Sequence, residues 1–221
     1  MKLIILILAS DDIYYLQMQE LWRIYMNNHK NIKSYFMKYD PTLQNDIAII
    51  KDTIFIKGNE SLVPGCLDKT IKSIDFLQKN IEFDFIFRTN LSSVVDLNKL
   101  YNLLNDNIEC SGIIGNCDRI KFVSGAGILL SKNVCQLLIT QKNTLNYNII
   151  DDVSLGLFFT NNNINITSLT RFEAYNYEHD VSVITKETIR DFYHFRCKSD
   201  KNNLKTIELM RKIIYIVINT I

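Results

Sequence analysis

Short apolar runs alternate along the chain with longer segments in which apolar residues recur at helical spacing. The first run, residues 2–9 (KLIILILA), is almost uninterrupted, which is typical of a strand buried on both faces of a parallel sheet. Strands are predicted at residues 2–9, 32–39, 47–50, 53–57, 83–87, 111–114, 121–123 and 164–169. Helices are predicted at residues 13–27, 67–78, 94–104, 132–140, 151–159 and 204–218.

Strands that alternate with helices indicate an α/β protein whose open, mostly parallel central sheet is flanked by helices. Ser10 or Asp11 is expected to cap the first helix, and Ser131 the helix over residues 132–140. The chain of 221 residues has only seven glycines and two prolines, which leaves little material for a flexible linker. One domain is therefore expected over residues 1–221.

The charges of the chain are nearly balanced. Its net charge of +1 argues against a sequence-independent nucleic-acid binder, because such proteins usually carry a basic excess. The five cysteines contain no CxxC pair and are odd in number, so neither a disulfide framework nor a zinc site is expected. A reducing, cytoplasmic compartment is the simplest location for such a chain.

The two ends of the chain are apolar but do not predict a membrane segment. Asp11 and Asp12 follow the first apolar run, where a signal peptide would have its cleavage region. The apolar run near the C-terminus is shorter than the roughly 20 residues that a bilayer requires.

Small polar residues follow the apolar run at residues 83–87 (FDFIF). Arg88 ends the run, and Thr89, Asn90, Ser92 and Ser93 come before the next helical segment. Ligands of open α/β sheets bind beyond the carboxyl ends of the strands. The segment RTNLSS is therefore a candidate ligand site.

A glycine-rich segment, FVSGAGILLS, spans residues 122–131. Gly125 and Gly127 allow either a tight turn or a close approach of the backbone to a ligand. The structural interpretation is a glycine turn between a strand and a helix, and the sequence alone leaves both interpretations open. The segment is not the dinucleotide-binding fingerprint GxGxxG, because the third glycine is missing.

Two adjacent carboxylates, Asp151 and Asp152, begin a predicted helix. One of them could act as a general base while the other has a structural task, since neighbouring residues do not share a helix face. They could equally just cap the helix, because Asp is common at helix N-termini.

Two cations, Arg196 and Lys198, stand two positions apart in the segment FYHFRCKS. In an extended segment both would lie on one face, where they could neutralise a diphosphate. The alternative is a solvated pair of surface charges.

The order of these segments resembles that of GT-A glycosyltransferases of the fringe and β-1,3-galactosyltransferase group. That group has an acidic-turn-Lys-Thr stretch, a strand that ends in a DxD motif, an SGxGY strand-turn and an EDVxxG motif. Here the corresponding segments are ESLVPGCLDKTIKSIDFL (residues 60–77), FDFIFRTNLSS (83–93), VSGAGILLS (123–131) and DDVSLG (151–156). The resemblance covers about residues 1–200.

The resemblance implies an inverting hexosyltransferase. It would move a hexose or N-acetylhexosamine from a nucleoside diphosphate sugar, with UDP the expected nucleotide, to a hydroxyl of a glycan or glycoconjugate acceptor. Asp152 matches the carboxylate that serves as catalytic base in that group, and Asp151 would orient the acceptor or the base. The resemblance further places Ser124, Gly125, Ala126 and Gly127 at the sugar and acceptor pocket, and Ala9, Ser10 and Asp11 near the nucleotide.

The chain departs from the group at the metal motif. Asn90-Leu91-Ser92 stands where the group has DxD, and these side chains are poor ligands for Mn²⁺ or Mg²⁺. Two interpretations follow. In the first, the enzyme is metal-independent: the cations Arg88, Arg196 and Lys198 offset the charge of the diphosphate, Asn90, Ser92 and Ser93 hydrogen-bond the ribose and phosphates, and Thr89 lies near the nucleotide. In the second, the protein binds a nucleotide sugar or glycan without turnover.

Overall fold

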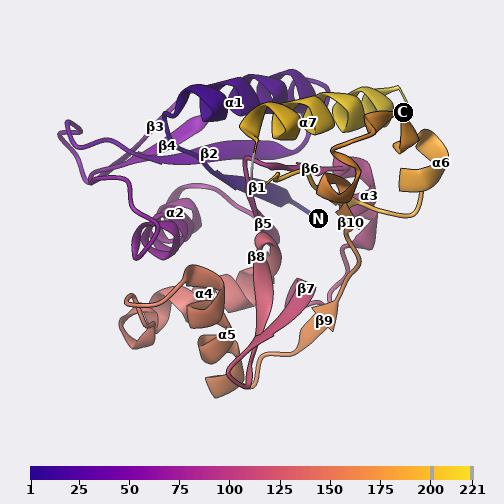
Figure 1. Ribbon diagram of the computed structural model, residues 1–221. Helices are drawn as coiled ribbons and strands as arrows, with labels where there is room; N and C mark the ends of the chain where they lie inside the picture. The colour runs from indigo at the N-terminus through magenta and orange to yellow at the C-terminus, as the bar shows by residue number, and fades with distance from the viewer. Residues whose placement is uncertain (200–201, 220–221) are drawn as a thin grey trace. The chain divides into compact units, whose positions relative to one another are not determined.

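In the part of the chain that the structure describes, residues 1–199 and 202–219, eight strands form one large sheet (Figure 1). In this computed structural model the strand order is β3-β4-β2-β1-β5-β8-β7-β9. The strands are β1 (Leu3–Leu8), β2 (Lys33–Tyr39), β3 (Ile47–Ile50), β4 (Thr53–Ile56), β5 (Phe85–Asn90), β7 (Cys110–Cys117), β8 (Ile120–Ser131) and β9 (Ile166–Ser168). The expected α/β class, with a large central sheet flanked by helices, is confirmed.

The pairing in this sheet is mixed. The pairs β1–β2, β2–β4 and β7–β9 are parallel, as expected from buried strands that alternate with helices. The pairs β3–β4, β5–β8 and β7–β8 are antiparallel. The antiparallel strand β8 therefore lies between β5 and β7, and it carries the glycine-rich segment.

The chain divides into two units that interleave along the sequence. The first unit consists of Met1–Ser10, Lys33–Thr89 and Asn105–Leu169, and the second of Asp11–Ile32, Asn90–Leu104 and the described residues from Thr170 onward. The expectation of a single domain over residues 1–221 stays a prediction.

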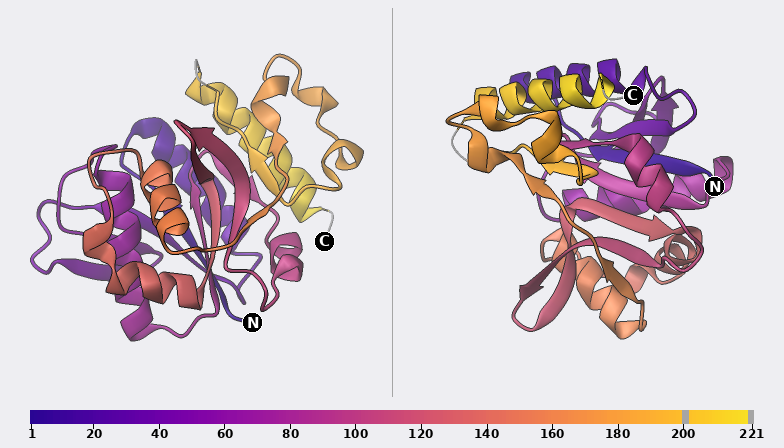
Figure 2. Two further views of the ribbon diagram at one scale, coloured as in Figure 1. Left: turned by 90° about the horizontal axis from the view of Figure 1, so that it is seen from below. Right: turned by 90° about the vertical axis from the view of Figure 1, so that its right-hand side faces the viewer.

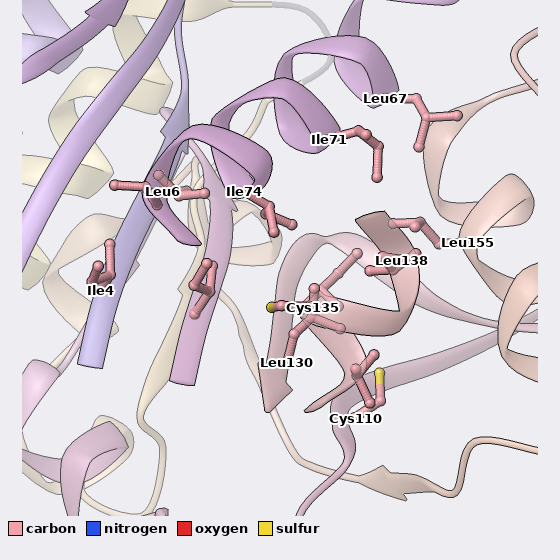
Figure 3. Packing of buried hydrophobic residues seen from close by; sticks show 14 of the residues in the cluster. Ile4, Leu6, Leu67, Ile71, Ile74, Cys110, Leu130, Cys135, Leu138 and Leu155 are labelled. Carbon is pink, nitrogen blue, oxygen red and sulfur yellow. The ribbon is translucent and has the colours of Figure 1, made fainter. Parts of the chain in front are cut away.

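The hydrophobic core of the first unit lies between the sheet and the helices α2 (Gly65–Asn80), α4 (Lys132–Thr140) and α5 (Asp151–Asn161). Figure 3 labels core residues from these helices and from the strands: Ile4, Leu6, Leu67, Ile71, Ile74, Cys110, Leu130, Cys135, Leu138 and Leu155. Burial raises the pKa of the Cys110 and Cys135 thiols, so both act here as small apolar side chains. All five cysteines are free thiols.

The second unit pairs two long helices with a small sheet. The helices α1 (Ile13–Met26) and α7 (Asn203–Ile218) lie side by side (Figures 1 and 2). The small sheet has the order β10 (Phe172–Glu173), β11 (His194–Arg196) and β6 (Ser93–Val95). The unit also contains the short helices α3 (Leu97–Leu103) and α6 (Lys186–Ile189) and the 3-10 helices η2 (Ala174–Tyr177) and η3 (Val181–Val183). Both long helices are confirmed predictions.

The helix predicted over residues 94–104 is wrong in its first part. Val94 and Val95 belong to β6, which pairs antiparallel with β11. Their β-branched side chains favour a strand, and α3 begins only after Asp96, whose side chain accepts a hydrogen bond from the Lys99 amide at 3.0 Å. The small sheet itself was not predicted, because strands of three residues carry no readable alternation.

Two further local predictions are corrected. The cap of α1 is Asp12, whose side chain accepts from the Tyr14 amide at 2.9 Å, and not Ser10 or Asp11. The glycine-rich segment is not a turn between a strand and a helix, because it lies inside β8, one strand from Ile120 to Ser131. The predicted cap of α4 is confirmed, since Ser131 accepts from the Val134 amide at 3.4 Å.

No described helix combines the length and the apolar character that a membrane crossing requires.

Helix α5 packs very closely on β8 at Gly156. A Cβ atom at Gly156 would lie 2.6 Å from the Cβ of Phe122 and 2.7 Å from the carbonyl oxygen of Lys121. These neighbours are backbone atoms or atoms next to the backbone, so they cannot rotate away. The glycine of the segment DDVSLG therefore allows the helix to approach the strand.

Replacing Gly156 by Ala should destabilise the protein, although Ala is normally the better helix former by about 1 kcal/mol. Overpacking typically costs about 1–3 kcal/mol, so we expect a net decrease in the free energy of unfolding, measured by urea denaturation. The control is Asn161→Ala at the exposed end of the same helix, which should change stability by less than about 0.5 kcal/mol. A Gly156→Ala variant at least as stable as the wild type would contradict the close contact.

Candidate active site

Arg88 lies near the end of β5 and is 2% exposed. Its Nη2 forms an ion pair with Oδ2 of Asp151, and its Nη1 donates a hydrogen bond to the carbonyl oxygen of Gly125. The guanidinium therefore connects β5 with both β8 and α5. The diphosphate role expected of Arg88 stays a prediction, but these contacts hold its guanidinium inside the protein.

The segment Ser124–Gly127 leaves the regular ladder between β7 and β8. Ile114 pairs with Val123 and Gly112 pairs with Ile128, so one residue of β7 lies opposite four residues of β8. This is an irregular bulge with more than the usual one extra residue, and it frees backbone groups of β8 for other partners. Thr89 of β5 anchors the bulge, because its hydroxyl donates to the carbonyl oxygen of Ala126 at 2.7 Å.

Asp151 and Asp152 occupy the first turn of α5. The residue in the cap position is Ile150, whose side chain makes no capping hydrogen bond, so neither carboxylate is the helix cap. Asp152 accepts from the amide of Gly125 at 3.2 Å through Oδ2 and from the amide of Val153 at 2.9 Å through Oδ1. Carboxylates in a first turn are also favoured by the helix dipole.

The surroundings raise the pKa of Asp152 above its ordinary value. Burial is the main cause, and the neighbouring charge of Asp151 adds to it. The amides of Gly125 and Val153 and the charge of Arg88 act in the opposite direction, but they do not cancel the increase. Asp152 is thus a better proton acceptor than a free aspartate.

Gly125 leaves no room for a side chain. A Cβ atom there would lie 2.6 Å from Nη1 of Arg88 and 3.4 Å from Oδ2 of Asp151. The structure shows a close approach of the Gly125 backbone to the Arg88–Asp151 pair. The close approach to a ligand stays a prediction.

The carboxyl end of β1 carries the residues expected near the nucleotide. Ala9 is buried, Ser10 is half-buried and Asp11 is exposed. Lys69 of α2, which is 3% exposed, donates to the carbonyl oxygen of Ala9 at 3.0 Å and pairs with Glu60 at 2.6 Å. Sequence reasoning assigned Lys69 no task of its own, although it lies in the acidic-turn-Lys-Thr stretch.

In the second unit the structure brings two of the expected residues together. Nη1 of Arg196 donates to the hydroxyl of Ser92 at 2.9 Å, although the residues are 104 positions apart. The carbonyl oxygen of Ser92 also accepts from the amide of Cys197 at 3.0 Å. Asn90 is the last residue of β5, and Lys198 lies exposed after β11.

These residues do not suit a divalent cation. Mn²⁺ and Mg²⁺ prefer carboxylate oxygens, whereas Asn90 and Ser92 offer neutral oxygens, and the guanidinium of Arg196 donates to one of them. Within residues 1–199 and 202–219 no three or more His, Cys, Asp or Glu side chains gather in a way that could hold a metal ion.

A cavity of about 590 Å³ in the first unit lies away from the candidate residues. Gln78 and Glu82 near the end of α2, Phe83 before β5 and Lys132 of α4 are among the residues that line it. None of the predicted site residues does.

No protein-family model and no curated protein matches the sequence. Solved structures do match. A glycosyltransferase involved in the glycosylation of the major capsid of PBCV-1 has a TM-score of 0.59 at 11% identity, covering 96% of this chain and 99% of that one. The glycosyltransferase GlyE of Streptococcus pneumoniae TIGR4 has a TM-score of 0.55 at 16% identity, covering 99% of this chain and 63% of that one.

The chain has the GT-A fold. At these identities the likeness shows the fold alone, and it does not single out the fringe group. The inositol-1-phosphate CTP transferase of T. maritima also matches, with a TM-score of 0.52 at 11% identity over 96% of both chains. Because a transferase of another class matches as well, the function has to be argued from the site.

Within this GT-A fold the expected nucleotide and sugar residues of the first unit lie near the carboxyl ends of strands β1 and β5. The amides of Asp84 and Phe85 donate to the carbonyl oxygen of Lys2, so these neighbouring strands start at the same end of the sheet. Their carboxyl ends, with Ala9 and Arg88, therefore lie together at the opposite end.

Replacing Asp151 by Asn should lower the pKa of Asp152. The substitution removes a nearby negative charge that raises this pKa, and the positive charge of Arg88 loses its anionic partner, which favours ionised Asp152 further. The measurement is a pH titration of the Asp152 carboxyl carbon by NMR. Asp180 is the control: hydrogen bonds from Ser182 hold its pKa below the ordinary value, and this should not change. An unchanged or higher pKa of Asp152 would refute the electrostatic coupling.

Proposed function

We propose that the protein is an inverting glycosyltransferase that works without a metal ion. It moves a hexose or N-acetylhexosamine from a nucleoside diphosphate sugar, UDP-linked, to a hydroxyl of a glycan. The observation that carries the proposal is Asp152, a carboxylate with a raised pKa that the first turn of α5 and the amide of Gly125 hold in a GT-A fold.

Asp152 is the general base in this proposal. It accepts the proton of the acceptor hydroxyl while that oxygen forms a bond to the anomeric carbon of the donor sugar. The bond from the anomeric carbon to the diphosphate breaks, and the nucleoside diphosphate leaves with the bonding electron pair. A carboxylate with a raised pKa suits this task because it binds the proton more firmly than a free aspartate does.

Side chains of the second unit take the place of the metal ion. The leaving diphosphate gains negative charge, and a guanidinium can bind two of its oxygens in parallel hydrogen bonds. Arg196 is suited to this task, with Lys198 as an additional point charge and with Asn90 and Ser92 as uncharged hydrogen-bonding partners. The contact between Arg196 and Ser92 supports this assignment, since it brings a cation to the segment that corresponds to the metal motif.

The competing function is a binding module of the same fold that holds a nucleotide sugar or glycan without turnover. The pair Asp151–Asp152 favours an enzyme, because binding alone does not need a carboxylate with a raised pKa. Release of UDP from a UDP-sugar in the presence of an acceptor distinguishes the two functions.

Replacing Asp152 by Asn should reduce kcat at least ~10²-fold and leave the affinity for the UDP-sugar nearly unchanged, because a general base acts in the transition state. The assay measures UDP release over a panel of UDP-sugars and acceptor glycans in EDTA. Asp191→Asn, at a side chain that is 86% exposed, is the control and should keep full activity. Turnover that persists in Asp152→Asn would exclude Asp152 as the base, and a wild type that binds UDP-sugars without turnover would indicate the binding module.

Replacing Arg196 by Ala should weaken UDP binding by about 1.5–3 kcal/mol if the side chain makes a charge-assisted bond to phosphate. Calorimetric titration with UDP in EDTA measures this loss. Arg190→Ala is the matched control, since Arg190 belongs to the same unit and its side chain is 79% exposed. Equal UDP affinity in both variants would show that Arg196 does not contact the phosphates, and UDP binding that requires Mn²⁺ would contradict the metal-free site.

A further inference from the structure

Arg88 is the most deeply buried charged group beside the proposed base. Its side chain is 2% exposed, and every contact described for it lies within the first unit. Burying a guanidinium is costly unless hydrogen bonds and an opposite charge compensate it. Here the compensation is incomplete, because within the described structure the buried Nε of Arg88 has no hydrogen-bond partner.

The two groups that Arg88 contacts both hold Asp152 in place. One is Gly125, whose carbonyl oxygen accepts from Arg88 and whose amide donates to Asp152. The other is Asp151, the preceding residue in the same helical turn. Arg88 therefore fixes the base from the strand side through the bulge and from the helix side through the neighbouring carboxylate.

We propose that Arg88 is a positioning residue for the base Asp152 and does not bind the diphosphate. The proposal rests on the function proposed above and assigns Arg88 a task within that site. Arg88 keeps Asp151 engaged and holds the Gly125 backbone against Asp152, so that only one of the two adjacent carboxylates remains to receive the proton.

The burial of Arg88 supports this assignment over phosphate binding. Nη1 and Nη2 each donate to the protein, Nε is enclosed and the residue is only 2% exposed, so the guanidinium has almost no surface from which to bind two phosphate oxygens. A side chain at position 125 would displace the guanidinium, because its Cβ atom would meet Nη1 of Arg88.

Few charged groups influence the proton of Asp152. On its own helix there is Asp151, which disfavours ionisation, and from β5 there is Arg88, which favours it. The half-buried thiol of Cys66 in α2 is close enough for the charges of Asp151 and Arg88 to shift its pKa. Burial raises this pKa, so the thiol stays protonated at neutral pH. Lys69 and Glu60 act on Cys66 and are not among the groups that shift Asp152.

The test compares Arg88→Lys and Arg88→Met with the wild type. A lysine keeps the charge but cannot hold Gly125 and Asp151 together in the fork geometry of a guanidinium. We expect kcat to fall about 10-fold or more in Arg88→Lys while the dissociation constant of UDP changes less than about twofold. In Arg88→Met the acidic limb of the kcat profile should also move to higher pH, because Asp152 loses a stabilising positive charge.

The matched control is Arg171→Lys. Arg171 is another arginine in an ion pair, with Glu173 at 2.6 Å, and its side chain is 12% exposed, but it lies in the second unit. Its replacement should leave kcat within about twofold. Arg88→Met removes a buried charge and leaves Asp151 unpaired, so its folding is checked first by thermal unfolding; if it does not fold, Arg88→Lys provides the comparison.

The outcomes separate this proposal from the proposed function. UDP binding that weakens about 10-fold in Arg88→Lys at unchanged kcat would show that Arg88 is a phosphate ligand and would overturn the proposal. An unchanged kcat together with an unchanged UDP affinity would also overturn it. If the wild type turns over no donor, the proposed function fails, and the NMR titration of Asp152 then tests the role of Arg88. A pKa of Asp152 that stays the same in both Arg88 variants overturns the proposal. A pKa that rises in the folded Arg88→Met or shifts in Arg88→Lys supports the proposal.

Discussion

The ion pair between Arg88 and Asp151 is the interaction on which the first unit's candidate site depends. It joins the end of β5 to the start of α5, and the same guanidinium donates to the bulge in β8. Three elements that are distant in sequence are thereby held at one place. The arrangement requires glycine at two positions, since a side chain at Gly125 would meet the guanidinium and one at Gly156 would push α5 away from β8. The glycines of both segments thus serve packing and leave the backbone of β8 within reach of Asp152.

The two adjacent carboxylates illustrate how position separates groups of the same type. Asp151 faces a fixed positive charge, whereas Asp152 accepts two amide hydrogen bonds and is partly buried. Burial raises the pKa of Asp152, and the nearby guanidinium limits this increase. In the proposed reaction the first group is structural and the second receives the proton. This is the division of tasks expected for neighbouring residues of a helix, because their side chains do not point to the same side.

The segment with Asn90 and Ser92 offers no carboxylate to a metal ion, and the structure brings Arg196 to the hydroxyl of Ser92. In the proposed function a protein-bound cation neutralises the diphosphate in place of a metal ion. A guanidinium provides the charge permanently and with a fixed hydrogen-bonding geometry, so the site needs no carboxylates to recruit it.

Local pattern alone determined much of this protein. The uninterrupted run of β1, the helical spacing of α1, α2 and α7, the cap Ser131 and the position of Asp151 and Asp152 in a first helical turn are all readable from the sequence, because they depend on neighbours within a few residues. The tertiary structure decided the rest. The bulge of β8, the strand β6 inside a predicted helix, the ion pair over 63 positions and the contact of Ser92 with Arg196 over 104 positions depend on strand register and on packing between distant segments. Register is set by the whole sheet, and no local pattern encodes which side chains it brings together.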